Sequence, residues 1–177
     1  MDGIGIGLIV VAAVVVVAVL LWAYRVANRL DRLHVRTDLA RQSLVAALDR
    51  RAVVARAIAA ALRERDDDGL QQLGTGLARL ADEAEATGID DRENVENELS
   101  VLLGKVAVAT KGITPHPTEL IAEISDAQTR VILARRFYND AVRDTLALAQ
   151  RRPVRWLRLG GRAPLPAYFE ITERVSA

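Results

Sequence analysis

The pattern of apolar and polar positions divides this chain into one unbroken apolar run followed by several helical stripes. Residues 3–24 form 22 consecutive uncharged positions. A helix of that length reaches roughly 33 Å, since each residue adds about 1.5 Å, and the hydrocarbon core of a bilayer is about 30 Å thick. The run therefore predicts a single transmembrane helix, with residues 1–24 as a short N-terminus and membrane span.

A cleaved signal peptide and the core helix of a soluble protein are the alternatives for this run. The two residues before it include no Lys or Arg, and it is longer than the roughly 7–15 apolar residues of a secretory signal. Trp22 and Tyr24 lie at its end, where aromatic side chains suit the membrane interface. We expect a retained anchor whose end is marked by Trp22, Tyr24, Arg25 and Arg29.

The charges on either side of the run predict its orientation. Five arginines occur within the 17 residues after it, namely Arg25, Arg29, Arg32, Arg36 and Arg41. Only Asp31 and Asp38 oppose them in that stretch, and the other flank carries only Asp2. Because cytoplasmic flanks carry an excess of Lys and Arg, we expect the N-terminus outside the cell membrane and residues 25 onward in the cytoplasm.

Beyond the apolar run, stripes at helical spacing predict three further helices. The first helix continues to the acidic residues 66–68, because no Pro or Gly interrupts residues 8–68. A second helix follows from Leu70 to Thr87. A third is expected from Asp90, with Glu93 at the spacing of a capping box. Its expected apolar stripe consists of Val95, Leu99, Leu102, Val106 and Ala109.

The fourth helix has the most regular stripe, from Leu120 to Leu148, after a turn at residues 115–117 and before Pro153. The predicted fold class is all-α: a single N-terminal transmembrane helix continues into an antiparallel long-helix bundle of three to four helices, with an irregular C-terminal tail. We assign residues 25–152 to the cytoplasmic bundle. Residues 153–177 form a tail, rich in Arg, Pro and aromatic residues, that packs on the bundle or the membrane surface.

Three polar residues of the fourth helix share one face, since Arg135, Tyr138 and Asn139 lie at i, i+3 and i+4. If the first and fourth helices are antiparallel, residues at equal height have numbers that sum to about 176 on a rise of ~1.5 Å per residue. Asp38 is then level with Tyr138. We expect a structural polar clasp among these residues, with a ligand or partner contact as the alternative.

The tail has a basic character that suggests lipid. Residues 145–169 contain five arginines and no acid. Together with an amphipathic Trp, such a segment suits anionic headgroups, although an ordinary solvated face is the alternative. The residues expected to touch the membrane surface are Arg151, Arg152, Arg155, Trp156 and Arg158.

Composition limits the chemistry that this chain can carry. The formal net charge is +1, so no strong field argues for a nucleic-acid partner. Without any Cys, disulfides and thiolate sites are excluded. The two histidines, His34 and His116, are far apart in sequence, and neither has a metal-ligand neighbour. We expect no cofactor, no metal site and no enzymatic activity.

Arg135, Tyr138, Asn139, Ala141 and Val142 form an Arg-x-x-Tyr-Asn core followed by Ala-Val on the predicted fourth helix. This motif resembles the hallmark of the LemA family of bacterial membrane proteins. Three further segments are similar in order and spacing: residues 36–39 (Arg-Thr-Asp-Leu), 96–99 (Glu-Asn-Glu-Leu) and 168–170 (Tyr-Phe-Glu). The chain departs from the family at residues 40–42, where Ala, Arg and Gln replace an apolar residue, Pro and Asn, so it resembles a divergent branch.

The resemblance implies a membrane-anchored helical domain without an established catalytic activity. Together with the residue patterns it favours a non-enzymatic scaffold or adaptor at the cytoplasmic face of a bacterial membrane. The lipid bilayer is the first expected partner, and a second copy of the chain or another membrane protein could be the next. The alternative is a membrane-coupled sensor or signal relay, in which the helix leaving the membrane transmits a displacement.

Overall fold

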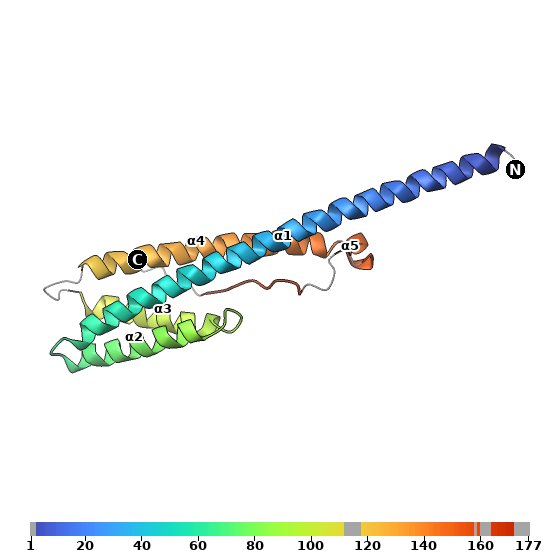
Figure 1. The fold of residues 1–177 in the computed structure, drawn as a ribbon. Helices are drawn as coiled ribbons and strands as arrows, with labels where there is room; N and C mark the ends of the chain where they lie inside the picture. Colours follow the sequence, from blue (N-terminus) through green and yellow to red (C-terminus); the bar gives the residue numbers. More distant parts are fainter. Residues whose placement is uncertain (1–2, 112–117, 158, 160–163, 172–177) are drawn as a thin grey trace. The chain divides into compact units, whose positions relative to one another are not determined.

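The computed structural model describes residues 3–111, 118–157, 159 and 164–171. Helices account for most of these residues, and none of them lies in a strand. The helices are α1 (Gly3–Arg63), α2 (Asp68–Ala86), α3 (Glu93–Ala109), α4 (Thr118–Ala149) and α5 (Arg152–Trp156) (Figure 1). The predicted all-α fold is therefore confirmed, and so is the uninterrupted helix that begins in the apolar run.

The chain packs as two compact units. The first unit comprises Met1–Leu39 and Asp140–Ala167, and the second comprises Ala40–Asn139 and Tyr168–Ala177. Both α1 and α4 contribute residues to each unit. The expected turn at residues 115–117 and the expected surface residue Arg158 lie outside the described residues.

The acidic run after α1 has a different role from the one that the sequence suggested. The helix ends before the acidic residues 66–68, as expected, and its last residue is Arg63. Asp67 is instead the N-cap of α2, where its Oδ1 accepts a hydrogen bond of 2.8 Å from the Leu70 backbone N–H. An Asp side chain is better used as a cap for free N–H groups than inside a helix, so the run starts α2.

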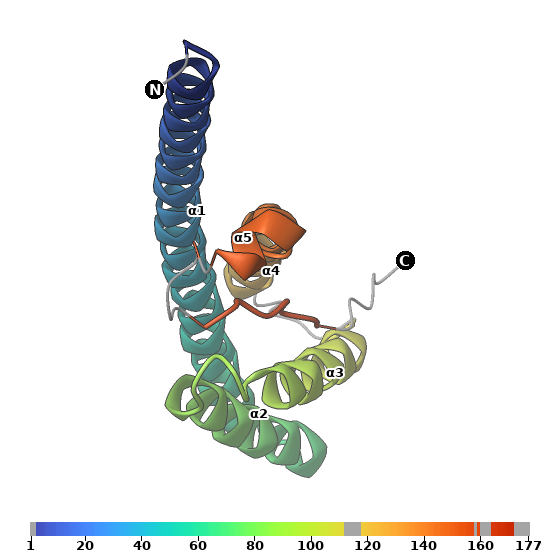
Figure 2. The ribbon, with the colours of Figure 1, turned by 90° about the vertical axis from the view of Figure 1, so that its right-hand side faces the viewer.

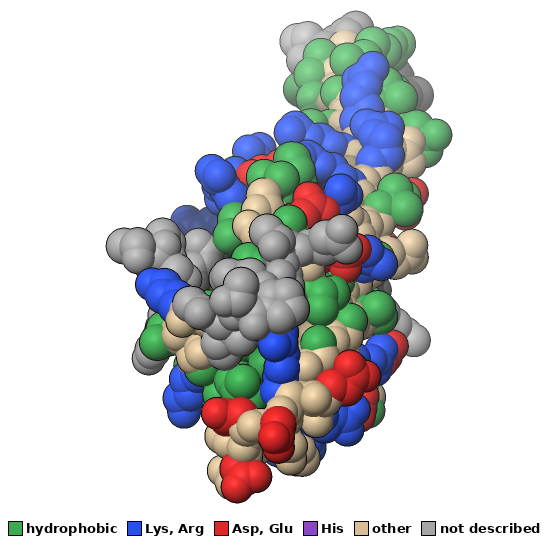
Figure 3. All heavy atoms as spheres, turned by 90° about the vertical axis from the view of Figure 1, so that its left-hand side faces the viewer, with side chains coloured by type: hydrophobic (Ala, Val, Ile, Leu, Met, Phe, Trp, Pro, Cys, Tyr) green, Lys and Arg blue, Asp and Glu red, His purple; other side chains and the backbone are tan. Residues whose placement is uncertain are grey.

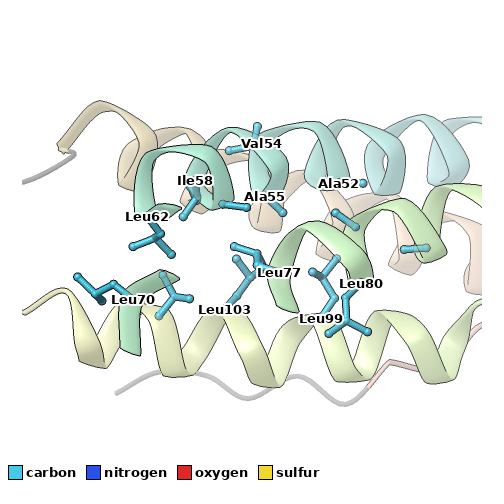
Figure 4. Close-up of a cluster of buried hydrophobic side chains, with 14 residues drawn as sticks. Ala52, Val54, Ala55, Ile58, Leu62, Leu70, Leu77, Leu80, Leu99 and Leu103 are labelled. Atoms are coloured by element: carbon cyan, nitrogen blue, oxygen red, sulfur yellow. The ribbon is translucent and has the colours of Figure 1, made fainter. Parts of the chain in front are cut away.

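An apolar core joins α1, α2 and α3 in the second unit. In Figure 4, Leu77 and Leu80 of α2 and Leu99 and Leu103 of α3 point toward the last turns of α1. Both views of the ribbon show α2 and α3 side by side (Figures 1 and 2). Gly74 allows the close approach of α2 to α1, because a Cβ at this position would lie 2.8 Å from the Ala59 carbonyl oxygen.

The start and the buried face of α3 differ from the prediction. No capping box forms: α3 begins at Glu93, and its N-cap, Arg92, makes no side-chain cap bond. The buried residues of α3 are Glu96, Leu99, Leu103 and Val106, whereas the predicted positions Val95 and Leu102 are only partly buried and Ala109 is exposed. The face is therefore rotated by about one position, so that Glu96 points inward.

In the first unit, α1 and α4 run antiparallel and meet through two threonines. The hydroxyls of Thr37 and Thr145 lie 3.0 Å apart and are both buried. Beside them, Arg36 Nη1 donates to Asp144 Oδ2 at 3.2 Å. Since 37 and 145 sum to 182, the expected register of 176 is wrong by about six residues, or roughly 9 Å along a helix. Asp38 is consequently level with the turn around Asp144.

Pro153 starts a helix as well as following one. The expected irregular tail contains α5, which has Pro at one of its first two positions. Proline suits the first turn of a helix because the missing N–H would have no partner there. Val154 of α5 is buried with Leu30 of α1 and Leu148 of α4, so α5 folds back onto the helix pair.

Candidate functional site

The N-terminal third of α1 exposes apolar side chains on all sides. From Ile6 to Leu21 every residue is exposed, and the most apolar 18-residue window of this helix has a mean hydropathy of 3.1 with none of it buried. A soluble protein rarely exposes a contiguous apolar surface of this extent. Among the described residues α1 is the one helix that is long and apolar enough to cross a bilayer.

The residues predicted to mark the end of the span lie directly after this surface. Trp22 and Tyr24 are exposed, and so are the side chains of Arg25 and Arg29. The next residue, Leu30, is buried. At this point α1 therefore changes from a helix exposed on every side to a helix with one buried face.

The residues expected to touch the membrane surface lie on α5 and just before it. Arg151, Arg152, Arg155 and Trp156 are all exposed. The cluster that holds α5 consists of Leu30, Leu148 and Val154, with Val26, Leu33, Ala149 and Leu159 packed against it. The structure thus brings α5 next to the segment of α1 that directly follows the apolar surface.

The Tyr-Asn pair of α4 holds the C-terminal segment in the second unit. The Asn139 amide donates from Nδ2 to the Phe169 carbonyl and accepts from the Phe169 N–H, each at 3.0 Å. This pair of bonds satisfies both backbone groups of Phe169, whose side chain is 3% exposed. Tyr138 is also buried. A carboxamide has one donor and one acceptor side by side, so Asn fits an extended backbone residue in this way.

A second bond fixes the same segment to α3. The Glu170 N–H donates to Glu93 Oε1 at 2.7 Å. Sequence analysis had placed Glu93 in a capping box, but its carboxylate binds the returning chain instead. One feature of the sequence could have revealed this contact. Tyr168 and Phe169 are adjacent aromatic residues outside any helical pattern, so they need a surface of another segment to pack on.

Asp38 and the Arg135–Tyr138–Asn139 face belong to different units. Asp38 is exposed in the first unit, whereas Arg135 is half-buried in the second. The polar clasp between Asp38 and this face stays a prediction. The contacts of Asn139 give the motif another structural role, which sequence reasoning missed.

Sequence reasoning also missed an ionic cluster that joins α1 to α3, formed by the buried residues Arg51, Arg92 and Glu96 and the partly exposed Asp49. Glu96 is fully buried and receives hydrogen bonds from Arg51 Nη2 and, at 2.7 Å, from Arg92 Nε. Arg92 also pairs with Asp49 at 2.7 Å.

Ser100 completes this arrangement by accepting from Arg51 Nη1 at 3.1 Å. The sequence contained a clue, because Arg51 stands on the apolar seam of α1 between Ala47 and Val54. An arginine at a buried position needs an acidic partner, since an unpaired buried charge is strongly unfavourable.

Acidic side chains gather over α2 and the connection before it. They are the red side chains at the bottom of the view in Figure 3. Arg56 of α1 reaches two of them, Asp82 and Glu85. The hydrogen bond from Arg56 lowers the pKa of Glu85 below its usual value. Since these groups are largely exposed, solvent screens the pair, and we assign it little stability.

A groove of about 1050 Å³ runs along α3 and α4 in the second unit. We call it the α3–α4 groove. Its described apolar lining includes Ile58, Leu62, Leu103, Val106, Ile124, Val131 and Ile132. Its described charged lining residues are Arg51, Arg65, Lys105, Lys111 and Arg135, and no acid is among them. Within the described ranges, no three His, Asp or Glu side chains are placed to hold a metal ion.

No protein-family model matches this chain. No curated protein matches it. No solved structure matches it either.

We predict that Asn139→Ala releases the segment around Phe169. The substitution leaves the buried Phe169 N–H and C=O without partners, which costs about 1–3 kcal/mol for such groups. Hydrogen exchange of the full chain in detergent micelles should become faster at residues 168–171. Asp140→Ala is the matched control, because Asp140 is exposed and its ion pair with Arg143 is local. Unchanged exchange in Asn139→Ala would contradict the role assigned to this amide.

A second prediction concerns the buried cluster. Glu96→Gln keeps the size of the side chain but leaves Arg51 and Arg92 without their shared negative charge. Removing one member of a buried ion pair costs about 3–5 kcal/mol, so the midpoint of chemical unfolding should fall markedly. Glu83→Gln, which breaks the exposed pair with Arg79, should cost less than about 1 kcal/mol. If Glu96→Gln and Glu83→Gln lowered the free energy of unfolding equally, the cluster around Glu96 would not be effectively buried.

Proposed function

We propose that this protein is a membrane-anchored helical scaffold or adaptor without enzymatic activity, which presents its helical units at the cytoplasmic face of a bacterial membrane. The single observation that supports this most is the exposed apolar surface of α1 from Ile6 to Leu21. Exposing this apolar surface to water would cost free energy. In a bilayer the helix needs no protein partner, because its backbone N–H and C=O groups bind each other.

The orientation in the proposal comes from the arginines that follow the span. Arg25 and Arg29 are exposed on the side where the helical units begin. Positive residues are retained on the cytoplasmic side of a membrane, so the helical units would lie inside the cell and the short N-terminus outside.

We also propose membership of a divergent branch of the LemA family. The resemblance rests on separate segments of the chain, and two of them are joined through Asn139 and Phe169. This contact supports a shared structural purpose for the Tyr-Asn pair and the closing aromatic residues.

The adaptor function needs a surface for a partner, and the α3–α4 groove is the strongest candidate. Its described lining is apolar with Lys105 and Lys111 at exposed positions and no described acid. Charge complementarity favours an apolar segment of a partner protein that is flanked by acidic residues.

The second candidate function, a signal relay, is supported by the continuity of α1. The helix runs without a break from Gly3 to Arg63, through the apolar surface and into the second unit. A continuous helix of this kind could carry a displacement out of the membrane.

We predict the topology from single cysteines, because the natural chain has none. In intact cells a membrane-impermeant maleimide should label Asp2→Cys but not Gly88→Cys, which should react only after the membrane is permeabilised. Gly88 is a suitable site because it is exposed and an added Cβ there meets nothing within 4 Å. Labelling of Gly88→Cys in intact cells would contradict the proposed orientation.

The adaptor proposal is tested by photocrosslinking of the full chain in living cells. A photoreactive residue at Ile132, in the α3–α4 groove, should capture a peptide that is apolar with acidic flanks, as identified by mass spectrometry. The control position is Gln72, exposed on α2 outside the groove. Lys105→Glu with Lys111→Glu should reduce the capture. Equal capture at both positions would contradict a specific site, and capture of a second copy would replace the heterologous partner with a homo-oligomer.

A further inference from the structure

α5 presents a large apolar side chain that nothing in the described chain covers. Trp156 is 86% exposed, and the next residue, Leu157, is 52% exposed. On the other side of the same short helix, Val154 is 2% exposed. A five-residue helix cannot be stable alone. Its position is therefore set by Val154, and the exposure of Trp156 is a consequence of how α5 is attached.

The attachment point lies close to the end of the apolar span. Val154 packs in a cluster with Leu30, and Val26 packs against the same cluster. Along α1, these two residues lie roughly 3–9 Å past Tyr24 at about 1.5 Å per residue. The headgroup zone on each side of the hydrocarbon core is about 5–8 Å thick. With the span in a bilayer, α5 is thus held at about the depth of the headgroups.

Exposed arginines from two elements surround this position. Arg25, Arg29 and Arg32 come from α1, and Arg151, Arg152 and Arg155 come from α5 and the residue before it. Among the ion pairs of the described residues, none involves these six arginines. Asp31 is the one acid within residues 25–36. The local charge is strongly positive, although the whole chain is nearly neutral.

We propose that α5 is a second membrane contact, which places Trp156 in the headgroup zone of an anionic leaflet while Arg151, Arg152 and Arg155 bind lipid phosphates. The indole of Trp is suited to this zone because its ring is apolar and its N–H can donate to headgroup oxygens. The inference rests on the proposed anchoring by α1 and adds a lipid preference to it: the span alone needs only an apolar core, whereas α5 requires negative charge.

This contact would also constrain the first unit. A single transmembrane helix can tilt and rotate, and a second attachment beside its end removes part of that freedom. Two adjacent attachments to the same leaflet also act with a high effective concentration, so a weak α5–lipid interaction would still be populated.

The test uses the full chain with Trp22→Phe, so that Trp156 is the remaining Trp. The protein is reconstituted into phosphatidylcholine vesicles, with or without phosphatidylglycerol, and with bromine atoms on the lipid acyl chains near the headgroup. In the anionic vesicles Trp156 emission should shift to shorter wavelength and be quenched by bromine, and high salt should weaken both effects. A Trp156 that stays in water would show neither effect in either lipid.

Two variants make the result specific. In the Trp22→Phe background, Arg151→Gln, Arg152→Gln and Arg155→Gln together should lower the ratio of lipid-bound to free α5 by about 100-fold at low salt, since each arginine contributes roughly fivefold.

The depth control is Leu39→Trp in a chain that lacks both natural tryptophans. Leu39 is exposed on α1 about 21 Å past Arg25, so its bromine quenching should be negligible.

Carbonate washing of the same vesicles separates this inference from the proposed anchoring. If α1 spans the bilayer, the chain and its triple Gln variant both resist extraction, whatever α5 does. Trp156 quenching that is equal in neutral and anionic vesicles, or unchanged by the triple substitution, would overturn the α5 contact while leaving the anchor in place. Extraction of the unsubstituted chain would overturn the anchor itself.

Discussion

The constraint on which this structure depends is that one continuous helix must satisfy two environments. The first part of α1 does not pack against any other described segment, and its apolar residues are exposed on every side. From Leu30 onward the same helix has a buried face, which supplies residues to both compact units. No Pro or Gly separates these parts, so the backbone passes from one environment to the other without a joint. Whatever surrounds the N-terminal part of α1 therefore also fixes where the helix enters the first unit.

Inside the units, polar groups specify how the apolar helices pack. Leu and Ala dominate the core of the second unit, and such residues alone would tolerate several registers. Glu96 must meet Arg51 and Arg92 in the interior, which only one rotation of α3 allows. In the first unit, the hydroxyl contact of Thr37 with Thr145 acts similarly on α1 and α4. We interpret these contacts as determinants of register, a role that buried polar residues have in other helical assemblies.

Much of the fold followed from periodicity, and the errors have local physical causes. The apolar run and the long helices give strong signals, because their patterns repeat over many turns. The alignment of α1 with α4 has no such signal in either helix alone, and the contact of Thr37 with Thr145 corrects it. The caps were less predictable, because Asp90 with Glu93 has the spacing of a capping box whereas Glu93 binds the Glu170 N–H. That bond, and the pairing of Asn139 with Phe169, join residues far apart in sequence and have no periodic signature. The short α5 was missed because its position depends on one buried residue, Val154.

Hydrogen exchange of the full chain in lipid nanodiscs tests the central claim most directly. If α1 lies in the bilayer from Ile6 to Leu21, the backbone amides of this segment are shielded from water and should remain unexchanged for hours. The same amides in a solvated helix end would exchange within seconds, because such ends open locally at little cost. Slow exchange of residues 6–21, with faster exchange in the exposed connection at residues 64–67, is the predicted result. Rapid exchange throughout residues 6–21 would contradict the account.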